Sequence, residues 1–112
     1  MKNVSVNYLM FMDARDVVTK KYDIPNKEGA ILRRIVIAKI NNETFTVNDV
    51  LQLKDIGSPA SNHSFLKKLV KRKLVESIPD ENDHRIRNLH PTKLALELFV
   101  QLSKEFNKFC KK

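Results

Sequence analysis

The spacing of apolar residues changes between Ser58 and Thr92, and this change constrains the fold more than any other feature. Over residues 58–73 apolar residues recur every three or four positions, which is the period of a helix. Over 74–78 and again over 85–89 they alternate with polar residues, which is the period of a strand. The polar cluster at 79–83, Pro-Asp-Glu-Asn-Asp, favours a turn between the two runs. The pattern therefore predicts a helix followed by a two-stranded hairpin.

Four other helices are predicted around this motif. Their expected ranges are 4–22, 26–41, 46–53 and 92–112, with a short β-rich piece at 44–46. Residues able to cap a first helical turn stand at the predicted starts: Asn26, Thr46, Ser58 and Thr92. The first helix is apolar around much of its circumference, so we expect it to pack against a large surface. A short helix, a turn containing Gly57 and a second helix followed by a hairpin form the layout of a winged helix-turn-helix.

Composition supports one domain of this class. The chain has 112 residues, of which 42% are hydrophobic, and it contains only 2 glycines, too few for the tight turns of an all-β fold. We predict a mainly α (α+β) winged helix-turn-helix with a two-stranded β-hairpin wing, built as a single domain over residues 1–112. The segments 1–22 and 91–112 are its expected N- and C-terminal dimerisation helices.

Several classes of protein are disfavoured. Cys110 is the single cysteine, so an intramolecular disulfide and a cysteine-based zinc site are excluded, and a reducing, cytoplasmic location is expected. His63, His84 and His90 lack the spacing of a metal site. No apolar run is long enough to cross a membrane, which predicts a soluble protein. The chain has no glycine-rich phosphate loop, paired carboxylates or nucleophile signature, so we expect no enzyme, no cofactor and no metal.

The charge balance favours a polyanionic partner. The chain carries 21 Lys and Arg against 13 Asp and Glu, a formal net charge of +8. Five cations fall within seven residues of the helix predicted over 58–73, with no acid among them: Lys67, Lys68, Lys71, Arg72 and Lys73. The outer face of this helix is small and polar early and cationic later. That profile suits a helix in the major groove of DNA, although a solvated lysine face is the alternative.

The hairpin turn adds a second candidate contact. Asp83 stands two positions before Arg85, so both side chains lie on the same side if the backbone is extended there. An arginine in this place can enter a minor groove while the aspartate orients its guanidinium. The alternative is a salt bridge in an exposed loop.

The sequence resembles MarR-type transcriptional regulators over roughly residues 30–100. The resemblance rests on three stretches, which are FLKKLVKRKLVE at 65–76, IPDENDHR at 78–85 and LHPT at 89–92. Its most specific features are the Leu-Val that starts the wing, the Asp-x-Arg of the turn and the Leu-x-x-Thr before the last helix. The resemblance implies that Arg85 is a minor-groove arginine oriented by Asp83. It also implies that Ser61, Ser64, Lys67 and Lys68 lie in or beside the major groove.

Three features depart from that family. Lys73 stands where the family commonly has a glycine that ends the recognition helix. Asn62 projects toward the core, where a polar side chain needs a partner. The chain is also shorter than usual members, which carry more C-terminal helix to complete the dimer and a pocket for small effectors. Binding of a small-molecule effector is therefore left open.

We predict a homodimeric, sequence-specific regulator of transcription that binds double-stranded DNA, with helix 58–73 in the major groove and wing 75–90 at the minor groove. The expected DNA-binding residues are Ser58, Ala60, Ser61, His63, Ser64, Lys67, Lys68, Lys71, Asp83, His84, Arg85 and Arg87. The expected dimerisation residues are Tyr8, Leu9, Phe11, Met12, Leu98, Leu102, Phe106 and Phe109. Two alternatives remain, a winged helix used for protein–protein contact and a basic protein associated with RNA or the ribosome.

Overall fold

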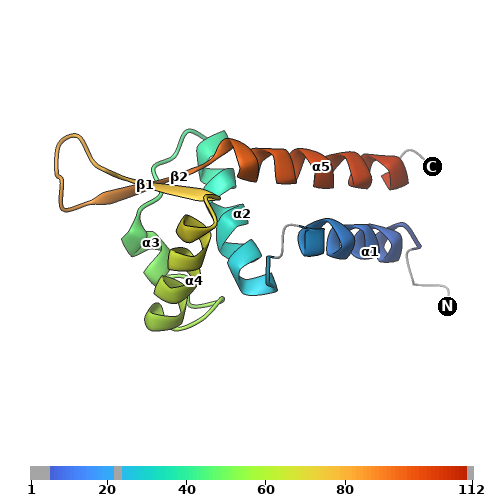
Figure 1. Cartoon of the computed structure of the whole chain (residues 1–112), viewed down its shortest axis with the longest axis horizontal. Helices are drawn as coiled ribbons and strands as arrows, with labels where there is room; N and C mark the ends of the chain where they lie inside the picture. Colours follow the sequence, from blue (N-terminus) through green and yellow to red (C-terminus); the bar gives the residue numbers. More distant parts are fainter. Residues whose placement is uncertain (1–5, 22–23, 111–112) are drawn as a thin grey trace. The chain divides into compact units, whose positions relative to one another are not determined.

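The structure is a computed structural model that describes residues 6–21 and 24–110. These residues form five helices and one antiparallel hairpin (Figure 1). Their order is α1 (Val6–Lys21), α2 (Asn26–Ile40), α3 (Val47–Leu51), α4 (Pro59–Lys71), β1 (Val75–Pro79), β2 (Arg87–Pro91) and α5 (Lys93–Cys110). The predicted order of the helices and the hairpin and the α+β class are confirmed, whereas the β-rich piece predicted at 44–46 forms an isolated bridge between Thr46 and Asn88 and no strand. None of the described helices is long and apolar enough to span a membrane.

The chain falls into two compact units. One is Asn26–Leu96, which holds α2, α3, α4, the hairpin and the first residues of α5. The other combines the described parts of Met1–Pro25 and Glu97–Lys112. All of the predicted DNA-binding residues belong to the first unit, which we call the winged-helix unit.

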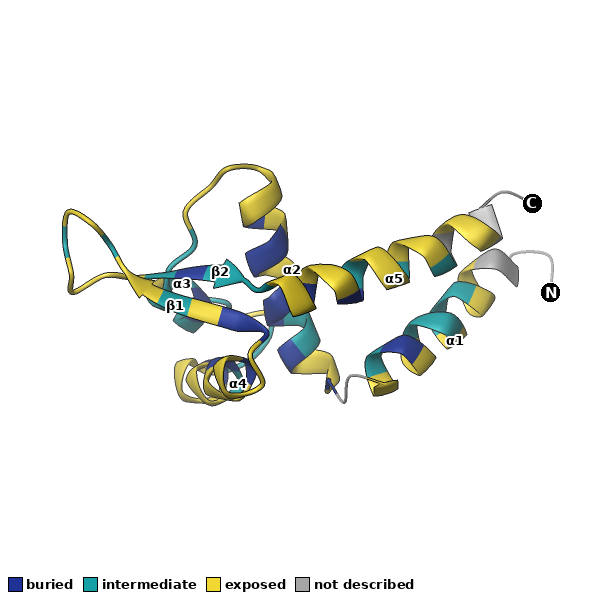
Figure 2. Cartoon of the chain, turned by 45° about the horizontal axis from the view of Figure 1, so that its top comes forward, coloured by how far each residue is buried: buried dark blue, intermediate teal, exposed yellow. Residues whose placement is uncertain are grey.

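The winged-helix unit has a core that all of its elements share. Helix α2 contributes Ile31, Leu32 and Ile35, and the other elements contribute Val50, Leu66, Leu69, Leu74, Val75 and Leu89, all at most 4% exposed (Figure 2). The hairpin pairs Val75 with Pro91 at one end and Pro79 with Arg87 at the other. Because side chains alternate across a strand, Val75, Ser77, Leu89 and Arg87 share one face of the hairpin. This face is buried near the core and exposed toward the turn.

The predicted caps of three helices are present. Thr46 forms a capping box with Asp49, in which each side chain accepts a hydrogen bond from the other residue's backbone amide, at 3.1 and 2.9 Å. Ser58 accepts a hydrogen bond from the amide of Ser61 at 3.2 Å. Thr92 caps α5 by accepting from the amide of Ala95 at 3.3 Å. Asn26, by contrast, is the first helical residue of α2 and not its cap.

Two helices end in residues with left-handed backbone conformations. Asn42 has φ 56°, which confirms the predicted end of α2 at 41–42. Lys73 has φ 62°, and α4 ends two residues earlier than predicted because this conformation cannot continue a helix. The amide of Lys73 donates to the carbonyl of Val70 and that of Leu74 to the carbonyl of Leu69, both at 3.0 Å. Lys73 therefore takes the helix-ending role that glycine usually fills.

Candidate nucleic-acid interface

Helix α4 presents a polar and cationic outer face. All eight predicted contact residues of its cap and helix are exposed: Ser58, Ala60, Ser61, His63, Ser64, Lys67, Lys68 and Lys71. The opposite side buries Asn62, Leu66 and Leu69 (Figure 2). The helical projection made from the sequence is therefore confirmed, and the contact of these side chains with DNA stays a prediction.

Asn62 joins α4 to the preceding helix and turn. Its side chain is fully buried, and its Nδ2 group donates to the carbonyl oxygens of Val50 and Leu53 at 3.0 Å each and of Gly57 at 3.3 Å. The last carbonyls of a helix have no partner within that helix, and Asn62 supplies one to the end of α3. These backbone carbonyls are the partners that a polar side chain in the core needs, and the bonds to them fix how α4 packs against α3.

The turn between α3 and α4 approaches Asn62 closely. A Cβ atom added at Gly57 would lie 3.0 Å from Asn62 Oδ1 and 3.5 Å from Ser61 Cβ. A side chain at this position would make Asn62 or the turn shift by a few tenths of an ångström. The φ of Gly57 is not positive, so glycine favours this turn through the space it leaves and not through its backbone conformation.

Asp80 organises the turn of the wing. Its Oδ2 accepts from the amides of Asn82 and Asp83 at 3.0 and 3.1 Å, and its Oδ1 accepts from Asn88 Nδ2 at 3.0 Å. These bonds, led by that from the Asn88 side chain, lower the pKa of Asp80. Asp80 is not among the residues predicted from the sequence, although an aspartate in a polar turn cluster is a known signal for such a turn.

Arg85 and Asp83 form the predicted pair, although the backbone between them is a turn and not extended, since the amide of Ile86 donates to the carbonyl of Asp83 at 2.9 Å. Arg85 Nε lies 3.0 Å from Asp83 Oδ1, and Arg85 Nη2 lies 3.0 Å from Asp83 Oδ2, so the contact is bidentate. The pair lowers the pKa of Asp83 and raises the pKa of Arg85. The Arg85 side chain is 90% exposed, against 34% for Asp83. The guanidinium of Arg85 is therefore held in one orientation while it remains exposed to solvent.

Arg87 is held by the neighbouring strand. Its Nε donates to Ser77 Oγ at 3.0 Å and its Nη2 donates to the Ser77 carbonyl at 2.7 Å. Both residues lie on the exposed part of the hairpin face that they share. No sequence signal indicated this pair, because it depends on the register of the two strands. His84, the other predicted wing residue, is exposed beside Arg85.

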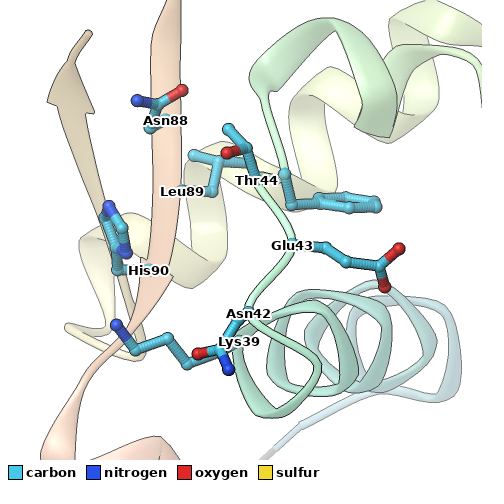
Figure 3. Close-up of a pocket in the computed structure, with 8 residues that line it drawn as sticks. Lys39, Asn42, Glu43, Thr44, Asn88, Leu89 and His90 are labelled. Carbon is cyan, nitrogen blue, oxygen red and sulfur yellow. The ribbon is translucent and has the colours of Figure 1, made fainter. Parts of the chain in front are cut away.

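A polar hollow lies elsewhere on the winged-helix unit, between the end of α2, the loop after it and β2 (Figure 3). Its lining residues are Lys39, Asn42, Glu43, Thr44, Phe45, Asn88, Leu89 and His90. The side chain of Glu43 points away from β2 in this view. The hollow contains none of the predicted DNA-binding residues. Within the described ranges, no group of three His, Cys, Asp or Glu side chains is placed to hold a metal ion.

The predicted dimerisation residues lie in the second unit and differ in exposure. Tyr8 and Leu9 are exposed, at 59% and 49%, and Phe11, Met12 and Leu102 are half-buried. Leu98 is only 2% exposed in the single chain. Its side chain is already covered in the single chain, and its contact with a second copy stays a prediction. The side chains of Phe106 and Phe109 lie outside those that the structure describes.

Comparisons with known proteins find similarity at the level of the fold. No family model matches the chain, and no curated protein matches it. Among solved structures, the DNA complex of MepR from S. aureus has a TM-score of 0.74 and 21% identity, covering 87% of this chain and 76% of that chain. MepR bound to ethidium bromide has a TM-score of 0.73 and 19% identity, covering 99% and 81%. The transcriptional regulator Tm0710 from Thermotoga maritima has a TM-score of 0.76 and 16% identity, covering 92% and 69%.

Proposed function

We propose that this chain, which has the winged-helix fold of MarR-type regulators, binds double-stranded DNA and regulates transcription. In this proposal α4 enters the major groove and the turn of the hairpin meets the minor groove. The observation that carries it is Arg85, which is exposed at the turn of the hairpin and fixed by two bonds to Asp83. The likeness to MepR, which has been solved in complex with DNA, supports the same reading of the fold. No catalytic step is part of the proposal.

The lysines of α4 suit contacts with the DNA backbone. Lys67, Lys68 and Lys71 are exposed, and none of them forms an ion pair with a carboxylate in the part of the chain that the structure describes. Their charges are therefore available to phosphate groups, whose neutralisation releases counterions and makes binding depend on salt. The small side chains of Ala60, Ser61 and Ser64 allow the first turns of α4 to approach the base edges.

Arg85 contributes orientation more than charge. Asp83 compensates much of its charge but fixes the plane of its guanidinium before DNA arrives. Ordering a long side chain on binding costs up to about 2 kcal/mol. Asp83 already orders Arg85 in the free protein, so binding to DNA does not add this cost. A narrow minor groove has an enhanced negative potential that attracts such an arginine, so sequences with narrow grooves should bind more tightly.

Replacing Arg85 tests the proposal. The probe is a duplex that the protein itself selects from a random library. Arg85→Ala should weaken binding to this duplex by at least about 1 kcal/mol, roughly fivefold, without changing the thermal stability of the chain. Lys104→Ala, which removes one exposed cation from α5, is the matched control and should bind like the wild type. Unchanged binding by Arg85→Ala would contradict the proposal, and Asp83→Ala should cause a smaller loss than Arg85→Ala.

The two alternative functions give different results in the same assay. A protein that works through RNA should bind a structured RNA more tightly than any selected duplex at every salt concentration. A winged helix used for protein contact should select no duplex from the library at all. A steep dependence on salt combined with a preference for the selected duplex supports the DNA-binding function.

We also propose that the chain acts as a homodimer, because paired half-sites double the number of base contacts. In the second unit, large apolar side chains are left exposed: Tyr8, Leu9, Met10, Val17 and Val100, at 40–70%. A second copy can cover them across a two-fold axis. Sedimentation equilibrium at micromolar concentration should give twice the chain mass of 13.0 kDa. Leu9→Glu should dissociate the dimer by placing a charge at the interface, and DNA affinity should fall with it. A mass of one chain for the wild type would refute the dimer.

A further inference from the structure

We propose that Arg87 grips a phosphodiester group of the DNA backbone and that Ser77 is the residue that positions it. The inference rests on the proposed function and assigns a ligand to a second arginine of the wing. It starts from the strand register, which pairs Ser77 with Leu89 and Pro79 with Arg87. Ser77 and Arg87 are therefore diagonal neighbours on one face of the hairpin, and they meet in two hydrogen bonds of 3.0 and 2.7 Å.

The hydrogen bonds leave one edge of the guanidinium unused. A guanidinium has five N–H donors, and Ser77 takes one from Nε and one from Nη2. Two donors on Nη1 and one on Nη2 remain, and none of them donates a hydrogen bond to a described residue; one N–H of each nitrogen lies on the outer edge of the group. Two parallel N–H groups on one edge match two oxygens of a phosphate, which is the bidentate geometry that arginine prefers.

The charge of Arg87 is also uncompensated. Its partners are a hydroxyl and a carbonyl oxygen, which are neutral, and no carboxylate forms an ion pair with it in the described part of the chain. Arg85 differs, because Asp83 neutralises much of its charge. The two arginines of the wing are both oriented in advance, but only Arg87 offers a full positive charge. A polyanion such as DNA therefore gains more electrostatic energy from a contact with Arg87 than from a contact with Arg85.

The position of Arg87 relative to Arg85 favours the backbone over the base edges. The two residues from Arg85 to Arg87 leave the turn and enter β2, and two residues of chain span at most about 7 Å. The minor groove is about 6 Å wide and about 7.5 Å deep. When Arg85 occupies the groove, Arg87 therefore lies near its rim, where the phosphates are. Ser77, which sits on the adjacent strand, holds the guanidinium toward that rim.

The test measures the salt dependence of binding to two duplexes of equal length, one selected by the protein and one of random sequence. Arg87→Ala should lower the slope of log affinity against log salt by about one unit, which is the loss of one phosphate contact. The same relation predicts a loss of about eightfold at 0.1 M salt and about fourfold at 0.2 M. The loss should be equal on both duplexes, whereas Arg85→Ala should weaken the selected duplex more than the random one.

Three further variants separate charge, orientation and folding. Arg87→Lys keeps the charge and should keep the slope while losing part of the affinity. Ser77→Ala removes one acceptor but no charge, so affinity should fall about two- to threefold with the slope unchanged, because one of the two bonds that orient the guanidinium is lost. Arg87→Gln retains an amide that can donate to Ser77, and it should lower the slope as Arg87→Ala does. It therefore tests the charge even if Arg87→Ala weakens the hairpin, which thermal melting will show.

The outcomes distinguish this inference from the function on which it rests. If the wild type selects no duplex, the proposed function fails. If the wild type binds in a way that depends on Arg85, but Arg87→Ala and Arg87→Gln keep the wild-type slope, the function stands and the phosphate assignment is overturned. If Arg87→Ala weakens only the selected duplex, Arg87 contacts bases and the assignment is also overturned. A lower slope with equal loss on both duplexes supports it.

Discussion

Asn62 should contribute more to the stability of the winged-helix unit than any other polar side chain of α4. Its Nδ2 group serves three backbone carbonyls, those of Val50, Leu53 and Gly57. The bond to Val50 is buried, and the other two are partly buried. Replacing Asn62 by alanine removes all three bonds, although the carbonyl of Val50 still accepts from the amide of Leu53 at 3.1 Å and that of Leu53 from the amide of Ile56 at 3.0 Å. We expect the helix-turn-helix arrangement to loosen as a result.

The magnitude follows from the number of bonds lost. Each intramolecular hydrogen bond contributes about 0.5–1.5 kcal/mol, so three lost bonds cost about 1.5–4.5 kcal/mol. Asn62 Oδ1 is buried without a partner, so its removal recovers part of this cost. The net loss should be about 2–3 kcal/mol, a large fraction of the roughly 5–15 kcal/mol by which domains are stable. For a chain of this size it lowers the melting temperature by roughly 10 °C.

Urea unfolding followed by circular dichroism measures this loss. Ser64→Ala, on the exposed side of the same helix, is the matched control and should unfold like the wild type. Asn62→Leu has a similar volume but no donor, and it should be destabilised almost as much as Asn62→Ala. A wild-type unfolding midpoint for Asn62→Leu would refute the reasoning, because it would show that the three carbonyls do not need this donor.

Asn62→Asp tests the direction in which stability changes with pH. The new carboxylate can only accept hydrogen bonds and would face three carbonyl oxygens, so the variant should be the least stable of the series at pH 7. Burial raises the pKa of such a carboxyl in the native state, and the native state then binds more protons than the unfolded state. The variant should therefore regain stability relative to the wild type as the pH falls from 7 to 5, and a constant difference would contradict this account.

Two further predictions concern the ends of the hairpin. Lys73→Gly should raise the free energy of unfolding by about 1 kcal/mol in urea titrations, because the left-handed conformation at φ 62° strains a residue with a side chain. A loss of stability would show that the lysine side chain makes a contact that stabilises the fold by more than the strain costs. The pKa of Asp80 is lowered in the folded state, so its stabilising effect is present above the ordinary value of 3.8 and is lost as the pH falls through the lowered pKa. Asp80→Asn should therefore lose less stability than the wild type on acidification below about pH 4, and parallel pH profiles would exclude this role.

The sequence by itself determined the features that depend on near neighbours. The change from a period of three or four to a period of two located the hairpin after α4, and Thr46, Ser58 and Thr92 marked the starts of three helices. The pairing of Asp83 with Arg85 also followed from a spacing of two residues. Each cap and the amide that it accepts from lie within four residues of one another, as do Asp83 and Arg85, so local backbone geometry brings them together whatever the rest of the chain does.

The tertiary structure decided the features that join distant parts of the chain. Asn62 was expected to need a partner, but its acceptors come from the end of α3 and from the following turn, whose places depend on how two helices pack. Ser77 meets Arg87 only in one register of the hairpin, since a shift by one residue would turn one of them to the other face. The apolar stripe that contains Leu98 is consistent with a core position and with an interface position, and in the folded chain other residues cover the Leu98 side chain. Hydrophobic spacing specifies that a face is apolar, and only packing specifies what covers it.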